Sequence, residues 1–420
     1  MKIRIYSPFL PYPVTEGAFQ LIFEQVLGFA KYHSVELVCW KDSFESLQSK
    51  IGDSKTGRPG IDDQFAKIFG PSVRLIHWPA KESQESGLMR MNRLLRSLPS
   101  LDASPGLYYY PPERDQREEL GPCDLAIYHY TFAWSWLRHR KQLEEQKTVI
   151  HWHNIESDQF EYRARQERVF ALAGIHRWNA MKLARQESEL EQLVDEFWMI
   201  SPKDLIDLRE RGSGKSASLR TPCYRAENLT QRRRAFEKHY LAVAKNLSAD
   251  GHPTIGFIGG LDFEPNRMSL EWILDRVCPL LKNENFTGIL KVVGKNAPPD
   301  LRDKMARFSF VNYVGFLPRL DPFWDELSLM LVPHITGSGV RIKLLDSIAS
   351  GVPALANDAA IERIHPDLRN SPFLSVADDP KDWAKLILRL KGQSLRAHLQ
   401  ERGMDKAFEF AAIYPTFAVE

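Results

Sequence analysis

The sequence predicts an α/β protein with two Rossmann-like domains, whose parallel sheets face each other across a cleft. Three observations support this fold class: the length, the composition, and an alternation of strands and helices that stops and then resumes. The chain of 420 residues is too long for one compact core and suits two domains of ordinary size. With 43% hydrophobic and 26% charged residues, its composition is that of a globular protein.

The first half of the chain opens with a strand, a loop, a helix and a second strand, at residues 2–7, 8–17, 18–32 and 35–40. Such alternation implies a parallel sheet, and ligands bind these sheets beyond the carboxyl ends of the strands. The loop at 8–17 is therefore predicted to point at a site. Further strands are expected at 73–77, 125–129, 148–151 and 197–200, with a long helix at 179–194.

A second series of strands and helices follows a charged helical stretch at 225–249. Its strands are expected at 254–258, 288–293, 311–314, 329–333 and 353–356, and its helices at 268–281, 300–308, 321–326 and 342–350. We assign 1–225 to the first domain, with an insertion around 41–122, and 226–395 to the second. A helical segment at 396–420 is predicted to pack back on the first domain.

Charge and cysteine usage exclude several functional classes. The formal net charge of +2 gives no global field that would attract nucleic acid, so nucleic acid is not an expected partner. The cysteines are scattered without metal-ligand spacing, and the acidic pairs at 62–63 and 378–379 have the pattern of loop residues, so no metal site is predicted. The N-terminus lacks the apolar core of a signal peptide, and no apolar run is long enough for a membrane span, which predicts a cytoplasmic protein.

The segment 334–353, HITGSGVRIKLLDSIASGVP, has the clearest chemical pattern. It predicts a strand end, a loop with Gly337 and Gly339, and a helix whose first turn contains Arg341 and Lys343. Glycines let the backbone approach a ligand closely, and the free N–H groups of a helix N-terminus bind anions. Cations are unfavourable at that end of a helix unless an anion neutralises them, so the pattern predicts a polyphosphate site. The alternative is a solvated loop with surface charges.

This segment resembles the donor-binding motif of the family-4 retaining glycosyltransferases. The resemblance implies a GT-B fold and a nucleotide-diphosphate sugar as co-substrate, with no other cofactor. Many members carry two glutamates at the positions held here by Ser338 and Asp346. The resemblance implies that Asp346 binds the ribose hydroxyls and that position 338 contacts the donor sugar. The run Gly337-Ser-Gly-Val340, followed by Arg341, resembles a variant of the motif in exopolysaccharide sugar transferases.

Two other stretches of the second half resemble parts of the same donor site. Residues 256–266 resemble the first strand and loop of the family's donor domain, with Gly259 and Gly260 in the loop that binds the diphosphate. The same stretch lacks the GxGxxG fingerprint of nicotinamide-binding proteins. Residues 314–317, which include Phe316, resemble the loop whose backbone reads the base.

Two positions of the first half also resemble that family. Residues 151–156 resemble its His-Asn-x-Glu segment, which implies that His153 faces the donor sugar near the reaction centre; a structural histidine is the alternative. Gly17 lies in a stretch that resembles the glycine loop near the donor phosphates or the acceptor. An ordinary turn is the alternative for Gly17.

The resemblance implies transfer of a sugar, with retention of anomeric configuration, to a glycan, a lipid-linked saccharide or another acceptor. A diphosphate leaving group needs charge neutralisation, which Arg341, Lys343 and the helix N-terminus would provide without a metal. Together with His153, these two cations are the predicted catalytic residues. Two alternatives stay open: an inactive nucleotide-sugar-binding regulator or subunit, suggested by Ser338, and an epimerase or phosphorylase on the same scaffold.

Residues 88–98 carry an amphipathic pattern, with leucine and methionine along one helical stripe and three arginines beside it. This is typical of a short interfacial helix, which would hold the protein peripherally at the inner face of the plasma membrane, near a lipid-linked acceptor. The alternative is a helix packed on the first domain with its arginines in water.

Overall fold

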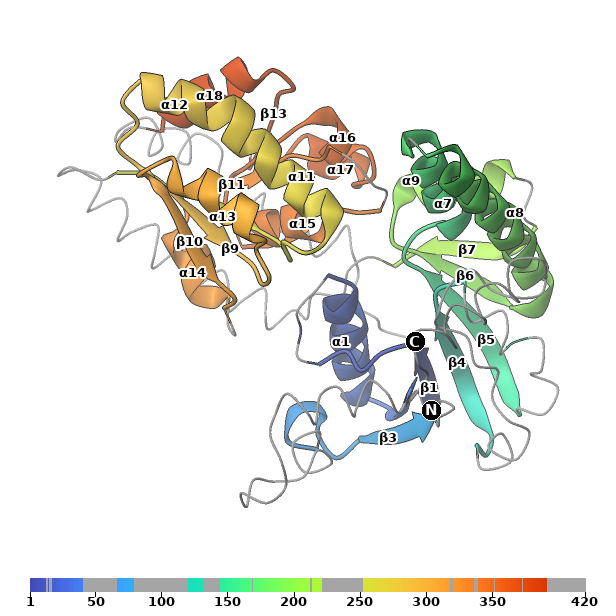
Figure 1. Ribbon diagram of the computed structural model, residues 1–420. Helices are drawn as coiled ribbons and strands as arrows, with labels where there is room; N and C mark the ends of the chain where they lie inside the picture. Colours follow the sequence, from blue (N-terminus) through green and yellow to red (C-terminus); the bar gives the residue numbers. More distant parts are fainter. Residues whose placement is uncertain are drawn as a thin grey trace. The chain divides into compact units, whose positions relative to one another are not determined.

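The computed structural model consists of two compact units (Figure 1), the first mainly Ala18–Cys223 with Met1–Val14 and the second mainly Tyr224–Thr416. The structure describes residues 1–12, 14, 17–40, 66–78, 120–131, 137, 144–167, 169–211, 214–220, 252–317, 320–335, 339–350, 352–371 and 373–390. Each unit contains one parallel sheet with helices, so the predicted α/β fold class with two Rossmann-like sheets is confirmed.

The first unit is built on a seven-stranded sheet in the order β3-β2-β1-β4-β5-β6-β7, with parallel neighbours throughout. The strands are β1 (Lys2–Ser7), β2 (Ser34–Trp40), β3 (Val73–Trp78), β4 (Cys123–His129), β5 (Glu145–Trp152), β6 (Glu196–Met199) and β7 (Ser216–Leu219). The first six were predicted from their apolar runs. Because the strand order reverses between β1 and β4, the loops that follow these two strands meet at a topological switch point, where such sheets bind ligands.

Four longer helices of the first unit are α1 (Gly17–Ala30), α7 (Glu156–Gln166), α8 (Phe170–Leu193) and α9 (Pro202–Glu210). The predicted helix at 179–194 is confirmed as α8, which begins earlier and runs beside α7 (Figure 1). The start of α9 follows local rules, since Pro202 opens it and the Ser201 hydroxyl accepts a hydrogen bond from the backbone N–H of Asp204 at 3.2 Å.

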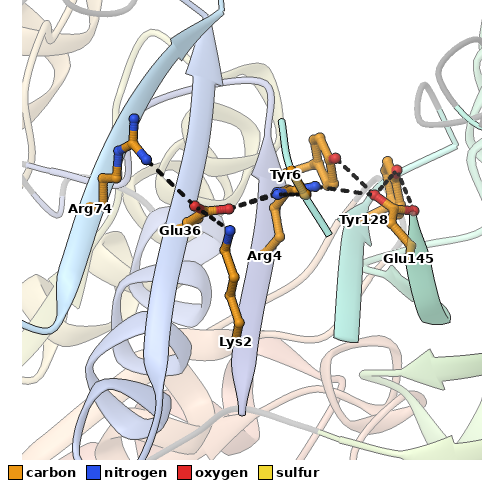
Figure 2. Close-up of polar contacts among 8 residues, drawn as sticks. Lys2, Arg4, Tyr6, Glu36, Arg74, Tyr128 and Glu145 are labelled. Atoms are coloured by element: carbon orange, nitrogen blue, oxygen red, sulfur yellow. Dashed lines mark hydrogen bonds and ion pairs between the residues drawn. The ribbon is translucent and has the colours of Figure 1, made fainter. Parts of the chain in front are cut away.

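A buried polar network crosses the sheet of the first unit (Figure 2). Arg4 is fully buried, and its Nε and Nη2 donate to Oε2 of Glu36 at 2.9 and 2.8 Å. The rings of Tyr6 and Tyr128 stack with centroids 4.1 Å apart, and both hydroxyls donate to Oε1 of Glu145, at 2.8 and 2.9 Å. A buried guanidinium is tolerated only with such partners, so the network ties together four strands, β1, β2, β4 and β5.

The second unit is built on a six-stranded parallel sheet in the order β10-β9-β8-β11-β12-β13. The strands are β8 (Thr254–Ile258), β9 (Ile289–Val293), β10 (Val311–Gly315), β11 (Leu329–Val332), β12 (Ala354–Ala356) and β13 (Leu374–Val376). Here the order reverses between β8 and β11. The loops after these two strands therefore form the switch point of this unit.

The helices of the second unit agree with most predicted positions. The helix expected at 268–281 is continuous but starts at α11 (Glu264–Trp272), passes through a π-helical turn (Ile273–Val277) and ends with α12 (Cys278–Asn283). The loop after β8 is thus shorter than the predicted 259–266. The other helices are α13 (Pro299–Ala306), α14 (Asp321–Glu326), α15 (Ile342–Ala349), α16 (Asp358–Ile361), α17 (Pro366–Arg369) and α18 (Pro380–Leu388), of which the last three were not predicted.

In the parts of the chain that the structure describes, no helix has the length and apolar character needed to cross a membrane. Most of the predicted insertion at 41–122, including the amphipathic pattern at 88–98, lies outside the described residues, as do 225–249 and 396–420.

Candidate functional site

The glycine loop after β8 has a close-packed backbone. A Cβ atom on Gly259 would lie 2.6 Å from Cγ of Asn266, and one on Gly294 would lie 1.9 Å from the carbonyl oxygen of Gly259. Asn266, in the first turn of α11, donates from Nδ2 to the carbonyl oxygen of Gly260 at 3.1 Å. These contacts explain why glycine is required at 259, and they bring the Asn266 side chain to the carboxyl end of β8.

Lys343 joins this loop to α15. Its Nζ donates to Oδ1 of Asn266 at 2.8 Å and lies 4.8 Å from the centroid of the Phe257 ring. Burial, and secondly the positive charge of Arg341, lower the pKa of Lys343 to about 7. The structure therefore brings Lys343 and the Gly260 backbone together through Asn266. Both residues were predicted from the sequence as parts of one site.

Arg341 immediately precedes α15. Its Nη2 donates to the carbonyl oxygen of Gly339 at 2.9 Å, and burial, then the charge of Arg363, lower its pKa to about 10. Gly339 has φ of 89°, in the left-handed region that glycine adopts at no steric cost, which explains a glycine here. The first turn of α15 contains no acidic residue. The two cations and the free N–H groups at the start of α15 thus all favour the binding of an anion.

Of the remaining second-unit candidates that the structure describes, Asp346 and Val340 lie on or just before α15, and Phe316 follows β10, the strand beyond β9. Asp346 is buried on α15, one turn after Ile342, and Val340 is half-buried in the loop before this helix. Phe316 is 49% exposed and follows β10 directly after Gly315, whose φ is 83°. Gly337 and Ser338 lie outside the described residues.

One side chain fixes the backbone of His334, just after β11. Asn357 Oδ1 accepts from the backbone N–H of His334, and Asn357 Nδ2 donates to the His334 carbonyl oxygen, both at 2.9 Å. Because both backbone groups of His334 are bonded to a single amide, the direction in which the chain leaves β11 is determined.

His153 lies at the switch-point edge of the first unit, just beyond β5. It is 4% exposed, and its Nε2 lies 2.9 Å from Nδ1 of His129, the last residue of β4. The ring of Tyr130 stacks on the His153 ring, with centroids 4.1 Å apart and planes at 27°. Tyr130 has φ of 69°, a strained conformation for a residue with a side chain, and such strain clusters at functional sites. Burial, then the charge of His151, hold the pKa of His153 well below its usual value.

The structure adds one buried residue that the sequence analysis did not select, Gln25 of α1. Its Oε1 lies 2.7 Å from Nε2 of His129, and its Nε2 lies 3.2 Å from Nδ1 of His151. A signal was present in the sequence, because Gln25 interrupts an otherwise apolar helical stripe that includes Leu21, Ile22, Val26 and Phe29. Gly17, a predicted site residue, is the first residue of this helix.

Two glutamates of the first unit have raised pKa values. Burial, then the charge of Glu187, raise the pKa of Glu156 to about 8, and burial raises the pKa of Glu187 to about 7. Glu187 Oε1 accepts from the backbone N–H of Ser157 at 3.0 Å, and Arg211 Nη1 lies 3.8 Å from Glu187 Oε2. Glu156 is the last residue of the His-Asn-x-Glu segment. Glu187, whose charge raises the pKa of Glu156, lies outside this segment on α8, so the motif alone could not identify it.

The chain is similar to several known proteins. Residues 252–392 match the family described as Glycosyl transferases group 1. Across 99% of this chain and 98% of the other, the structure is similar to sucrose-phosphate synthase from Thermosynechococcus elongatus, with 15% identity and a TM-score of 0.56. WaaG, a glycosyltransferase involved in lipopolysaccharide biosynthesis, gives 14% identity over 98% and 99% of the two chains, with a TM-score of 0.57.

Anabaena HepE, solved in complex with UDP-glucose, is similar at 10% identity over 98% and 99% of the two chains, with a TM-score of 0.53. No curated protein sequence gives a significant match. At these identities the structural similarity establishes the fold, whereas function depends on the site. The chain thus has the GT-B fold, and its residues 252–392 are similar to the family described as Glycosyl transferases group 1.

Proposed function

We propose that the protein transfers a sugar from a nucleotide-diphosphate sugar to a hydroxyl of a glycan or lipid-linked saccharide, with retention and without a metal. The observation that carries the proposal is the pair of cations at the start of α15. Arg341 and Lys343 are both held in lowered-pKa environments, and no acidic residue of the first helical turn neutralises them. A diphosphate would bring negative charge to these two cations.

The other contacts follow from this position of the diphosphate. Asp346, one turn along α15, is proposed to accept hydrogen bonds from the ribose hydroxyls, and the loop with Phe316 is proposed to lie along the base. Gly259 and Gly260 allow the phosphates to approach the backbone after β8. His153 is proposed to contact the donor sugar.

The reaction is a substitution at the anomeric carbon. The bond from this carbon to the β-phosphate oxygen breaks, and the acceptor oxygen forms its bond on the same face. The acceptor proton passes to the departing phosphate oxygen, and Arg341 and Lys343 stabilise the negative charge that develops on the nucleoside diphosphate. These two cations take the role that a divalent metal has in other transferases, so activity should survive EDTA.

UDP-sugars are the first donors to test, because HepE was solved with UDP-glucose and a trehalose-6-phosphate structure from E. coli with UDP-2-fluoro glucose. The test measures thermal shift and donor hydrolysis across UDP-, GDP-, ADP- and TDP-sugars, followed by product analysis with saccharide acceptors. Transfer to an acceptor, unaffected by EDTA, supports the proposal. Binding without turnover would instead indicate a regulator, a changed free donor would indicate an epimerase, and a strict metal requirement would contradict the proposed mechanism.

A further inference from the structure

A continuous chain of hydrogen bonds, which we call the relay, links three buried histidines of the first unit, His151, His129 and His153, through Gln25. His151 Nε2 lies 3.0 Å from the carbonyl oxygen of Arg220, and His151 Nδ1 lies 3.2 Å from Gln25 Nε2. Gln25 Oε1 lies 2.7 Å from His129 Nε2, and His129 Nδ1 lies 2.9 Å from His153 Nε2. The Gln25 side chain and all three histidines are at most 4% exposed.

The three imidazoles are neutral near pH 7, so each ring carries one N–H. Burial lowers the pKa of His151 to about 3 and holds those of His129 and His153 well below the usual histidine value. The positive charge that each ring would gain also disfavours protonation of its neighbours. Every contact in the chain must therefore join one donor and one acceptor.

The Arg220 carbonyl gives the chain its direction, because a carbonyl oxygen can only accept. His151 must donate from Nε2, which leaves Nδ1 to accept from the Gln25 amide nitrogen. The opposite orientation of the Gln25 amide would require a second proton on His151, which its low pKa excludes. Gln25 Oε1 then accepts from His129 Nε2–H, and His129 Nδ1 in turn accepts from His153 Nε2–H.

We propose that Gln25 is a positioning residue that acts through His129 to hold His153 in the Nε2–H tautomer, so that His153 Nδ1 accepts a hydrogen bond from a hydroxyl of the donor sugar. The sugar contact rests on the proposed function, whereas the tautomer does not. Within the residues that the structure describes, His153 Nδ1 makes no hydrogen bond, and the stacked Tyr130 ring fixes the plane of the imidazole.

This arrangement resembles the way in which second partners orient catalytic and metal-bound histidines, where one ring nitrogen is bonded so that the other has a defined role. Here the orienting group, Gln25, acts on His153 through His129, and the chain of hydrogen bonds ends at the backbone carbonyl of Arg220. The neutral Nδ1 lone pair can accept from a hydroxyl, but it cannot bind a negatively charged group as an imidazolium would. The relay therefore selects a hydroxyl at this point rather than an anionic group.

The test is nitrogen NMR of the full-length protein labelled with 15N-histidine, in which nitrogen shifts and two-bond proton couplings identify each tautomer. Signals are assigned by replacing the three histidines one at a time. We expect Nε2–H forms for His129, His151 and His153 at neutral pH. A proton on Nδ1 of His153 in the wild-type protein would overturn the proposal.

Two variants of Gln25 and one control test its role. Gln25→Met removes both relay bonds, so a second tautomer of His153 should appear. Gln25→Glu keeps an acceptor for His129 Nε2–H, so His153 should stay in the Nε2–H form while the change is confined to the His151 side. The control is Gln186→Met, which replaces another buried glutamine of this unit and should alter none of the three. An unchanged His153 in folded Gln25→Met, or a changed one in Gln25→Glu, contradicts the assignment.

Binding separates the tautomer from the sugar contact. In calorimetric titrations, Gln25→Met should bind UDP-glucose about fivefold more weakly than the wild type, the equivalent of one hydrogen bond, and should bind UDP equally well. An equal loss for both ligands, or no loss, would contradict the sugar contact. Wild-type protein that binds neither ligand would contradict UDP-glucose as the donor under the proposed function, while the spectra still decide the tautomer.

Discussion

The switch points of the two units have the same strand geometry but different electrostatics. Both sheets reverse their strand order between the first and fourth strand. At the first unit's switch point, the buried neutral rings of His129 and His151 are hydrogen-bonded to Gln25, and His151 also to a backbone carbonyl. At the second unit's switch point, Arg341 and Lys343 carry positive charge into a partly desolvated helix start. The two units thus share a strand order, and the residues that follow the strands give each switch point its own chemistry.

The largest expected effect concerns the two cations at the switch point of the second unit. Replacing both Arg341 and Lys343 by alanine should weaken nucleotide-sugar binding by more than about a hundredfold, because each charge-assisted contact to phosphate contributes roughly 1.5–3 kcal/mol. The measurement is calorimetric titration with the donor identified by the screen. Lys381→Ala is the matched control, since Lys381 also lies in the first turn of a helix of this unit but beside its capping residue, Asp379. Unchanged affinity of the folded double variant would remove α15 as the diphosphate site.

The second prediction tests whether the first unit depends on internal partners for its buried polar groups. Arg4→Met should lower the free energy of unfolding by roughly 1.5–3 kcal/mol, because Glu36 loses the guanidinium but keeps Lys2, whose Nζ lies 3.0 Å from its Oε1. Urea unfolding followed by tryptophan fluorescence measures this loss. The double variant Arg4→Met/Glu36→Leu should lose less, since it removes both members of the buried pair, and an equal or larger loss would contradict the assignment.

The same network has a defined pH dependence. Although burial alone would raise it, hydrogen bonds from Lys2 and Arg4 hold the pKa of Glu36 below its usual value. The stabilisation is therefore complete above the unfolded-state pKa of Glu36 and is lost as the pH falls through the lowered folded-state value. Arg4→Met should have its largest effect at neutral pH and a smaller one in acid.

The third prediction uses the pKa of Lys343, about 7 in the free protein. A bound diphosphate would raise this pKa, so binding should take up a proton near neutral pH. Affinity should then fall as the pH rises above 7, by up to about tenfold per pH unit until the pKa of the complex is reached. Titrations in buffers of different ionisation enthalpy measure the proton uptake. In Lys343→Arg the side chain stays charged, so the pH dependence should vanish; a flat profile for the wild type would indicate that Lys343 does not meet the diphosphate.

The fold could be predicted to a large extent because most strands are continuous apolar runs bounded by turn residues. The strands that sequence reasoning missed are short and have weak patterns: β7 reads SASL and has no buried residue, and β13 has three residues. The start of α11 was misplaced because Glu264 and Pro265, which favour a first helical turn, lie in a stretch interpreted as a glycine loop.

The site could be predicted only where its residues are close in sequence. Arg341 and Lys343 follow the glycine loop directly, so local rules for helix starts were sufficient. The relay joins Gln25 to histidines that lie 104 and 126 positions away, and only the strand order of the sheet brings them together. Similarly, Asn266 reaches Lys343 across 77 positions, so the partner of this lysine could not be inferred from spacing.

The smallest expected effect distinguishes the nucleotide from the sugar end of the donor. Asp346→Asn should weaken binding of the free nucleotide and of the nucleotide sugar alike, by about fivefold, because ribose hydroxyls donate more strongly to a carboxylate than to an amide. The replacement keeps the shape of a buried side chain on α15, so the fold should be retained, as a thermal melt can verify. Parallel titrations with UDP and UDP-glucose provide the measurement. Gln25→Met should affect only the sugar nucleotide, so the two variants together separate the ribose contact from the sugar contact. Equal binding by Asp346→Asn would move Asp346 to a structural role in α15, and a loss confined to the sugar nucleotide would place it beside the sugar instead of the ribose.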